Sequence, residues 1–258
     1  FISARHAAMP RAIQIPDHML FDGNIPASAA NMVLAELEVA ENTLSPWKRM
    51  RLGKITGSEF HRVTRDKGGK GWSEGAKSDM AELLFEWITG EEANKFSGNA
   101  ATEWGELYEP EAILKYEAKT GRKVKRGQFF LAENFAGLVG CTPDGVGERG
   151  LENKCPYGPK AHMYTLLTKK VPTEYMDQVY GHMLCAKRDC CDFSSYDPRM
   201  KKRPDLEMVI LEVEKNAFYM EDLEGRLYDF EQDLITNLDQ LEIDWRSATK
   251  NDPAILSI

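Results

Sequence analysis

The sequence predicts a single α/β domain in which a mixed central β-sheet is flanked by helices. Two observations lead to this class: long helical patterns alternate with short strand-like runs, and a glycine-rich reversal at 145–150 joins two of those runs. The chain has 258 residues, enough for one sizeable hydrophobic core. We therefore expect one domain over 1–258, with the proline-containing stretch 1–27 as an N-terminal arm.

Helical periodicity defines the longest elements. In residues 78–88 the apolar side chains recur three and four positions apart, and Gly90 ends the pattern. Further helices are expected over 28–41, 104–120, 173–186 and a final leucine-bearing stretch from Leu223 to Leu241. Pro110 should either kink the helix that contains it or mark its start. The leucine seam of the final helix is typical of a coiled coil or of packing on a sheet, and we favour the sheet.

Short apolar runs bounded by turn residues predict the strands. They fall at 128–131, 135–139, 151–155, 192–196 and 206–213. The second and third of these runs are expected to form a hairpin around the glycine-rich reversal. Residues 66–77 (DKGGKGWSEGAK) predict a mobile loop, which either tracks single-stranded or frayed DNA by charge and stacking or is an ordinary surface loop.

The composition limits the classes of function. Hydrophobic residues make up 42% of the chain, and no apolar run approaches the roughly 20 residues that a membrane span needs. A net charge of -8 argues against a nonspecific nucleic-acid binder, but a local basic surface can still bind DNA. Basic residues do gather in four clusters, each of which alone is typical of a solvated surface: 48–54, 65–70, 122–126 and 199–203.

The cysteines predict a reduced protein rather than a metal protein. None of the five forms a CxxC pair, and the spacing of His182, Cys185, Cys190 and Cys191 fits no usual zinc pattern. No secretory signal is recognisable at the start of the sequence. We therefore expect a cytoplasmic protein with free thiols.

Residues 140–156 (GCTPDGVGERGLENKCP) hold the candidate catalytic group. Glu152 and Lys154 are two positions apart on a predicted strand, so they project from one face, and the hairpin can bring Asp144 beside them. Two carboxylates from neighbouring strands suit Mg²⁺ or Mn²⁺, and an adjacent ammonium can orient a water or stabilise a charged phosphorane. An ordinary surface hairpin with a Glu–Lys pair would show the same short pattern.

A second candidate site lies in residues 43–60 (TLSPWKRMRLGKITGSEF). Ser58 is placed to cap the helix that follows, and a helix N-terminus beside Arg51 is suited to bind a phosphate. The alternative is an arginine that covers a helix without binding a ligand.

Several motifs together resemble one known family. Pro143-Asp144 followed by Glu152-Asn153-Lys154 resembles the PD-(D/E)xK nuclease signature, and the wider string is similar to the lambda exonuclease family of YqaJ-like viral recombinases. The pattern W-x-x-x-R-L-G-x-I-T-x-S occurs at 47–58, W-G-x-x-Y-E at 104–109, a Q-V pair at 178–179 and D-P-R-M at 197–200. The resemblance covers roughly residues 43–242 with the motifs in the same order, and it implies the restriction-endonuclease-like fold.

The resemblance also implies a metal site. Asp144 would bridge two Mg²⁺ ions, with Mn²⁺ as an alternative. Glu152 and the backbone carbonyl of Asn153 would complete one ion, and Glu109, otherwise an ordinary exposed helix residue, would complete the other. Lys154 would position or activate the attacking water. The polar Asn153 departs from the apolar residue usual at its position, so this strand is expected to be more exposed.

The remaining site residues implied by the resemblance bind the substrate. Gln178 would contact the water or the scissile phosphate, although it could also be a polar residue on an exposed face. Arg51 and Ser58, with the neighbouring Thr56, would hold the terminal 5′-phosphate of the DNA.

The implied function is an Mg²⁺-dependent 5′→3′ exodeoxyribonuclease acting on linear double-stranded DNA in a bacterial host cell. It would release 5′-phosphomononucleotides and leave 3′ overhangs for phage recombination by strand annealing. The family also implies a homotrimeric ring around DNA and a single-strand annealing protein as partner. The alternatives are an Mg²⁺-dependent endonuclease of the same fold and a catalytically inert module that binds DNA ends.

Overall fold

The computed structural model describes residues 45–93 and 98–250. Almost all of this part belongs to one compact unit, Trp47–Ile258. The predicted arm 1–27 and the predicted helix 28–41 lie outside the described residues, so the prediction of one domain over the whole chain stays a prediction. No helix within the described ranges is long and apolar enough to cross a membrane.

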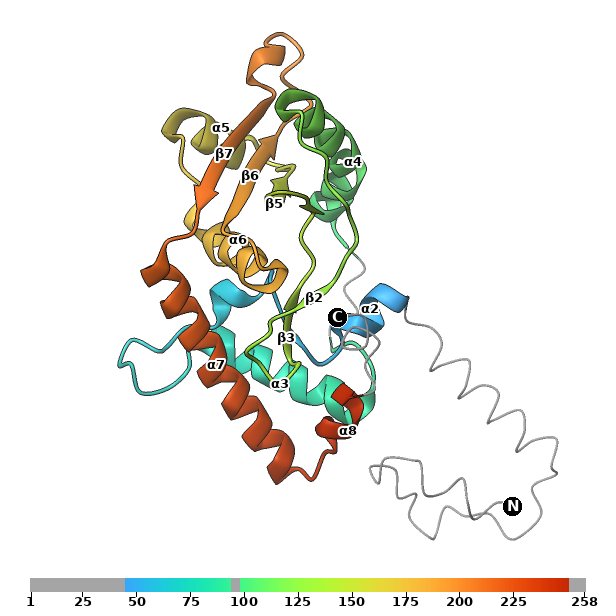
Figure 1. Ribbon diagram of the computed structural model, residues 1–258, viewed down its shortest axis with the longest axis vertical. Helices are drawn as coiled ribbons and strands as arrows, with labels where there is room; N and C mark the ends of the chain where they lie inside the picture. Colours follow the sequence, from blue (N-terminus) through green and yellow to red (C-terminus); the bar gives the residue numbers. More distant parts are fainter. Residues whose placement is uncertain (1–44, 94–97, 251–258) are drawn as a thin grey trace, which may run out of the picture. The chain divides into compact units, whose positions relative to one another are not determined.

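Helices and short strands alternate along the chain (Figure 1). The helices are α2 (Pro46–Arg51), α3 (Glu74–Thr89), α4 (Ala100–Thr120), α5 (Pro159–Thr168), α6 (Thr173–Ala186), α7 (Ala217–Gln240) and α8 (Trp245–Lys250), with 3₁₀ turns η3 (Phe60–Arg62) and η4 (Pro204–Leu206). The strands are β1 (Ile55–Thr56), β2 (Phe130–Leu131), β3 (Val139–Cys141), β4 (Gly145–Val146), β5 (Gly150–Lys154), β6 (Cys190–Tyr196) and β7 (Met208–Glu214).

Local signals fix the ends of the long helices. The Ser73 hydroxyl accepts a hydrogen bond from the Ala76 N–H at the start of α3, and Asn99 caps α4 in the same way through Ala101 and Thr102. Gly90 ends α3 in the left-handed conformation that glycine adopts without steric cost. The helix α4 starts before Pro110 and runs through it, so the alternative that the helix starts at that proline is wrong.

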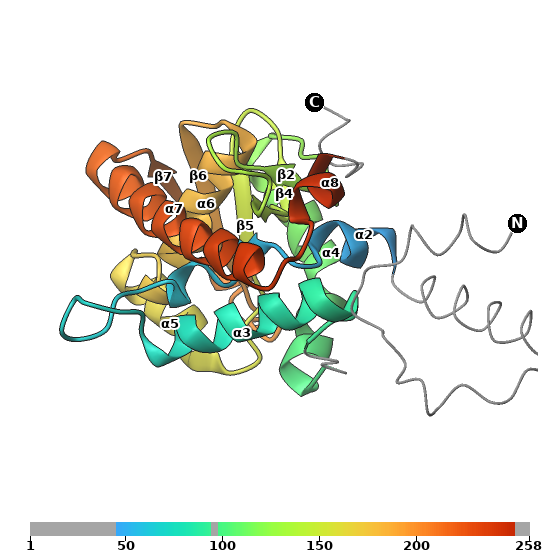
Figure 2. The same cartoon turned by 90° about the horizontal axis from the view of Figure 1, so that it is seen from below.

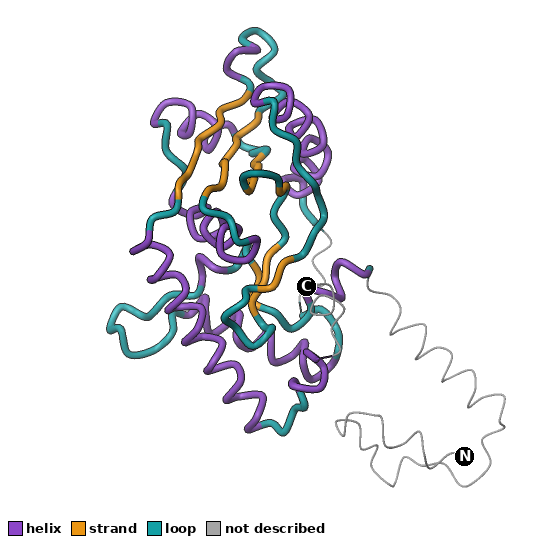
Figure 3. The backbone as a smooth tube through the Cα atoms, viewed as in Figure 1, coloured by secondary structure: helices purple, strands orange, loops and turns teal. Residues whose placement is uncertain are grey.

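Two small mixed sheets form the centre of the unit. The first has the order β1-β3-β2, with β1 parallel and β2 antiparallel to β3. The second has the order β4-β5-β6-β7, in which only β5 and β6 are parallel. Much of the chain between α4 and β5 is loop, drawn in teal in Figure 3. The prediction of an α/β fold with a mixed sheet flanked by helices is confirmed.

The predicted hairpin has a different first strand. Residues 145–146 pair with 150–151, so the glycine-rich reversal is correct. The apolar run before Asp144 continues instead into β3, which pairs with β1 and β2 in the other sheet. The chain therefore changes sheets between Cys141 and Gly145, and this change places Asp144 between the two sheets.

Helices cover both faces of the second sheet. Leu151 of β5 packs in one cluster with Ala112, Ile113 and Tyr116 of α4. Cys191 and Phe193 of β6 belong to the larger core on the other face, to which α6 contributes. The side-chain alternation of a strand thus directs successive β5 residues to α4 and α6 in turn.

The final helix α7 packs on other helices and belongs to the larger core cluster. It lies beside α3 (Figure 2) and contacts α6 as well. Five side chains of its apolar stripe have no exposed surface: Leu223, Leu227, Phe230, Leu234 and Leu238. Leu241, the last residue of the predicted seam, is 50% exposed. The seam therefore packs inside this unit, in one core cluster with residues of β1 and β3.

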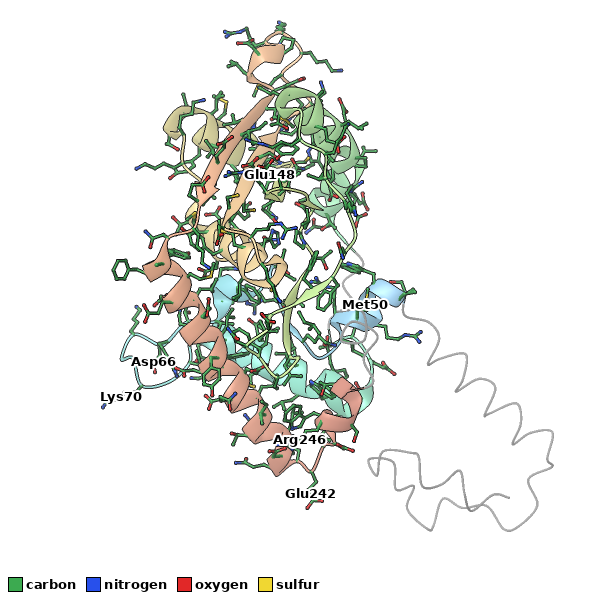
Figure 4. All side chains as sticks on the ribbon, viewed as in Figure 1. Met50, Asp66, Lys70, Glu148, Glu242 and Arg246 are labelled. Atoms are coloured by element: carbon green, nitrogen blue, oxygen red, sulfur yellow. The ribbon has the colours of Figure 1, made fainter. Side chains whose placement is uncertain are left out.

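The lysine-rich loop before α3 is partly anchored. Figure 4 labels Asp66 and Lys70 on this loop, and the Asp66 carboxylate accepts hydrogen bonds from the N–H groups of Gly68 and Lys70. Trp72 is only 9% exposed, and its indole N–H donates to Asp233 of α7. Trp72 therefore packs against the core and is not available to stack on DNA bases.

Candidate active site

The central strand β5 presents Glu152 and Lys154 to α6. Both side chains leave the same face of the strand, and the Lys154 ammonium forms an ion pair with the Glu152 carboxylate. Asn153 points to the opposite face, where its amide oxygen accepts a hydrogen bond from the Ser194 hydroxyl at 2.6 Å. Asn153 is only 6% exposed, so the expectation of a more exposed strand was wrong: a cross-strand partner satisfies the polar middle residue.

Asp144 lies in the turn between β3 and β4. Its Oδ2 accepts a hydrogen bond of 2.7 Å from the backbone N–H of Asn153, which ties the turn to β5. Burial raises the pKa of Asp144 well above its ordinary value, and the neighbouring carboxylate of Glu152 raises it further. The two carboxylates are thus close enough to repel one another.

Lys154 is held in its charged form. Burial alone would lower the pKa of this ammonium, but the carboxylates of Glu152 and Asp144 outweigh burial, and the pKa lies above its ordinary value. Its Nζ also donates to Oε1 of Gln178 at 3.3 Å. Lys154 is therefore oriented from two sides, by its strand neighbour and by α6.

Arg51 ends α2 beside the turn that follows β1. Its guanidinium donates to the hydroxyl of Thr56 at 2.8 Å and to that of Thr142 at 3.4 Å, and it lies over the ring of Trp47. Burial lowers the pKa of this guanidinium. These contacts fix one edge of a planar donor group of the kind that binds phosphate oxygens in pairs.

The turn after β1 does not have the predicted cap. The residue before η3 is Glu59, which makes no side-chain cap, and Ser58 is an exposed turn residue. The Glu59 carboxylate instead accepts hydrogen bonds from the N–H and the hydroxyl of Thr56. The predicted helix after Ser58 is only a 3₁₀ turn of three residues, so a strong helix N-terminus is absent from this described segment.

A glycine in α6 allows this helix to pack closely against η3. A Cβ atom on Gly181 of α6 would lie 2.4 Å from the ring of Phe60 in η3, a separation that real side chains do not reach. Only glycine at this position allows α6 to approach η3 so closely. The close packing brings the end of β1, with Thr56, and the following turn, with Ser58, beside the helix that carries Gln178.

One cleft of about 450 Å³ joins the predicted residues. Its lining includes five of them, from four separate parts of the chain: Arg51, Ser58, Glu109, Asp144 and Gln178. Glu152 lies behind this surface with 0% exposure. The structure therefore brings the candidate phosphate-binding group and the candidate metal-binding group to one site.

Glu109 reaches the cleft but is already paired. Its carboxylate forms an ion pair with Arg126, which lines the same cleft. It is near enough to Asp144 to raise the pKa of that carboxyl. Within residues 45–93 and 98–250, no group of three or more His, Cys, Asp or Glu side chains is arranged to hold a metal ion. Glu109 as a metal ligand thus stays a prediction.

The donor set nevertheless fits a hard divalent cation. Both carboxylate oxygens of Glu152 are buried, Oε1 forms the ion pair with Lys154, and Oε2 makes no hydrogen bond to any described residue. Asp144 repels Glu152 at close range. A cation beside Asp144 and Glu152 would offset this repulsion and give Oε2 of Glu152 a partner, and carboxylate oxygens are what Mg²⁺ and Mn²⁺ prefer.

Sequence reasoning missed four residues of the cleft. Thr142 and Arg126 hold predicted residues in place, and Trp47 stacks on Arg51. His182 lines the cleft from α6, and its Nδ1 lies 3.3 Å from Oε2 of Glu152. The spacing of His182 from Gln178, one helical turn, was the available signal.

The cysteines stay free thiols in the described structure. Cys141 and Cys191 are buried, and burial raises the pKa of both thiols well above the ordinary value. Raised pKa values keep thiols protonated and weakly reactive. These surroundings suit protonated thiols, and the expectation of a reduced protein stays a prediction.

The fold and the carboxylate–lysine pair at the end of β5 define a nuclease of the restriction-endonuclease-like class. Residues 46–189, more than half of the chain, match the YqaJ-like viral recombinase domain, and the chain belongs to this family. Membership makes the protein a nuclease that acts on DNA, as the motifs predicted.

Solved structures agree with this family. The chain is similar to an alkaline exonuclease from Laribacter hongkongensis, with a TM-score of 0.67 and 30% identity over 79% of this chain and 97% of that one. A crystal structure of that exonuclease in complex with dAMP matches equally well. A phage-related exonuclease from Haemophilus somnus 129PT, at 16% identity and a TM-score of 0.58 over 72% of this chain and 96% of that one, supports the fold. A comparison with curated proteins found no match.

Proposed function

We propose that the protein is an Mg²⁺-dependent 5′→3′ exodeoxyribonuclease that acts on the ends of linear double-stranded DNA. It releases 5′-phosphomononucleotides and leaves 3′ overhangs for recombination by strand annealing in the cytoplasm of a bacterial host. The observation that carries this proposal is the single cleft that joins Arg51 to Asp144 and Gln178. A site for a terminal phosphate beside a site for phosphodiester hydrolysis suits an enzyme that cuts from an end.

The cation site consists of Asp144, Glu152, the carbonyl of Asn153 and, for a second ion, Glu109. Bound Mg²⁺ would lower the pKa of water and neutralise charge on the scissile phosphate. Lys154 holds the attacking water and offsets the charge that develops on the phosphate.

The neighbouring residues orient these groups and the substrate. Gln178 accepts from Lys154 and thereby aims the ammonium. Arg51 binds the terminal 5′-phosphate together with the hydroxyls of Thr56 and Ser58, with Thr142 bracing the guanidinium.

The family supports the proposed product and assembly. The complex of the Laribacter hongkongensis exonuclease with dAMP supports a deoxynucleoside monophosphate as the product. We infer a homotrimeric ring and a single-strand annealing partner from the family resemblance. Light scattering coupled to size-exclusion chromatography tests the ring, for which a mass near three times 29.2 kDa is expected.

The first test uses linear duplex DNA with one 5′-phosphorylated and one 5′-hydroxyl end, with Mg²⁺ or with EDTA. A covalently closed circle of the same sequence is incubated alongside. We expect metal-dependent loss of the 5′-phosphorylated strand, release of mononucleotides and an intact circle. The variant Arg51→Gln should lose most of the preference for the phosphorylated end, by about 10-fold or more, because it removes the charged fork that binds phosphate.

Two other outcomes identify the alternatives. Cutting of the closed circle would indicate an endonuclease of the same fold. Retained end binding without cleavage in any divalent metal would indicate an inert end-binding module, which the intact Asp144, Glu152 and Lys154 argue against. Asp144→Ala with unchanged cleavage would contradict the assigned cation site.

A further inference from the structure

Two polar residues on α6, Gln178 and His182, lie opposite the two charged residues of β5, Lys154 and Glu152. Gln178 and His182 are four positions apart, a rise of about 6 Å on one helix face. Glu152 and Lys154 are two positions apart, about 6.6 Å along one strand face. The spacings agree closely enough for both pairs to meet: Gln178 Oε1 lies 3.3 Å from Lys154 Nζ, and His182 Nδ1 lies 3.3 Å from Glu152 Oε2.

His182 is buried without a directed partner. Its side chain is 1% exposed, and neither ring nitrogen makes a hydrogen bond to any residue that the structure describes. Oε1 of Glu152 forms the ion pair with Lys154, but Oε2 is buried and makes no hydrogen bond to any described residue either. Buried polar atoms without partners are costly, and a donor and an acceptor 3.3 Å apart both gain when they pair.

The two ring nitrogens of His182 have different surroundings. Nδ1 faces Glu152, and Nε2 lies on the side of the turn after β1, where a Cβ on Gly57 would come within 3.7 Å of it. An ionised carboxylate only accepts hydrogen bonds, so Nδ1 must carry the proton for the pair to form. The ring then has a defined tautomer and a fixed orientation behind the cleft.

We propose that His182 is a positioning residue for Glu152, whose carboxylate it fixes by donating from Nδ1–H to Oε2. The helix α6 then orients both charged residues of β5, Lys154 through Gln178 and Glu152 through His182. This inference rests on the proposed function, since it concerns a carboxylate assigned to the cation. Residues that hydrogen-bond a metal ligand fix its direction, and their loss costs about 10- to 100-fold in metal affinity.

The test is Mn²⁺ binding to metal-stripped protein without DNA, followed by the electron paramagnetic resonance signal of free Mn²⁺. In His182→Asn the amide N–H replaces the Nδ1–H, whereas in His182→Gln it reaches only the position of Nε2. We expect His182→Asn to keep Mn²⁺ affinity within about threefold of the native protein. His182→Gln should bind about 10- to 100-fold more weakly and lose kcat by a similar factor, with little change in KM for DNA.

His162 supplies a matched control. It is also fully buried on a helix, α5, but its ring nitrogens contact the Ser195 hydroxyl and the Leu206 carbonyl, each at 2.9 Å. His162→Gln should lower the melting temperature and leave Mn²⁺ affinity unchanged. This contrast separates positioning of a ligand from general support of the core.

The other outcomes of these measurements distinguish a positioning role of His182 from a packing role and from failure of the proposed function. Native-like Mn²⁺ affinity in both His182 variants would overturn the positioning role while leaving the proposed function intact. Equal loss in both variants, with a melting temperature lowered as in His162→Gln, would reduce His182 to a packing residue. A native protein that binds no Mn²⁺ and cleaves no DNA would overturn the proposed function as well.

Discussion

Asp192 and Glu152 are equally buried carboxylates on neighbouring strands, with 0% of either residue exposed. Asp192 points to the α4 face of the sheet, where the Tyr116 hydroxyl donates at 2.6 Å and Arg122 at 2.7 Å, and Arg149 completes the group. Glu152 points to the α6 face and meets Lys154 and the like-charged Asp144. Burial alone therefore does not distinguish a carboxylate with a full set of donors from one without, but the number of directed donors does.

The physical reason is the cost of a buried charge. A carboxylate removed from water needs donors that replace its hydration. On the α4 face this requirement is met within the protein, which rigidifies the sheet. On the α6 face it is left incompletely met, and such a site gains stability by taking up a cation.

The largest expected effect follows from changing Asp144, which lies beside Glu152 on the α6 face, where the carboxylates lack a full set of hydrogen-bond donors. Asp144→Asn keeps an oxygen that can accept from the Asn153 N–H but removes one of two repelling charges. We expect cleavage to fall by about 10³-fold or more, on the order of 4 kcal/mol in activation free energy. The unfolding midpoint in EDTA should stay equal or rise, because like-charge repulsion is relieved.

Steady-state cleavage and urea unfolding, measured on the same preparation, check this prediction. An Asp144→Asn protein that loses stability in EDTA together with activity would show that the site is a structural ion cluster like that of Asp192.

A change of Asp192 tests the α4 face, where the buried carboxylate has a full set of donors. Asp192→Asn removes the charge that faces Arg122 and Arg149, and leaves both guanidinium groups without their buried partner. We expect a loss of about 3 kcal/mol in the free energy of unfolding, since breaking a buried pair strands the remaining charge. Cleavage per folded molecule should stay within about twofold of the native rate. A large loss of kcat at unchanged stability would contradict the structural assignment.

The sequence predicted the long elements well because their signals are local. The helix over 173–186 has the predicted ends, and Gly90 ends α3 as expected, although α3 begins at Glu74 inside the predicted loop. The strand partner of the glycine-rich hairpin was wrong because a two- or three-residue strand carries little pattern of its own. Whether Val139 pairs with Ile55 or with β5 is decided by contacts between distant parts of the chain. The short helices α5 and α8 were missed for the same lack of periodicity.

The positions of the candidate site residues were predictable where these residues form a short sequence motif. Asp144, Glu152 and Lys154 lie close together as the strand geometry requires. The sequence could not place His182 beside Glu152, because this contact depends on how α6 is aligned against β5. The alignment in turn depends on the close approach at Gly181. The ion pair of Glu109 with Arg126 was likewise hidden, since the two residues are far apart in the sequence.

The smallest expected effect concerns Glu231 of α7. In its number of hydrogen-bond donors it lies between Asp192 and Glu152. It is fully buried, one oxygen accepts from the Ala136 N–H at 2.8 Å, and the other has no hydrogen bond within the described residues. Burial raises its pKa from 4.5 to about 7, although the N–H groups of Ala136 and Leu138 oppose the rise.

This raised pKa makes stability depend on pH in a definite direction. Below about pH 4.5 the carboxyl is protonated in both states and Glu231 imposes no charge penalty. As the pH rises to about 7, the unfolded chain ionises first, so stability falls by about 3 kcal/mol and then levels off. Glu231→Gln cannot ionise, so its stability relative to the native protein should rise over this window. Urea unfolding at intervals from pH 4.5 to 8 measures the difference, and parallel curves for the two proteins would mean that Glu231 is solvated like a surface carboxylate.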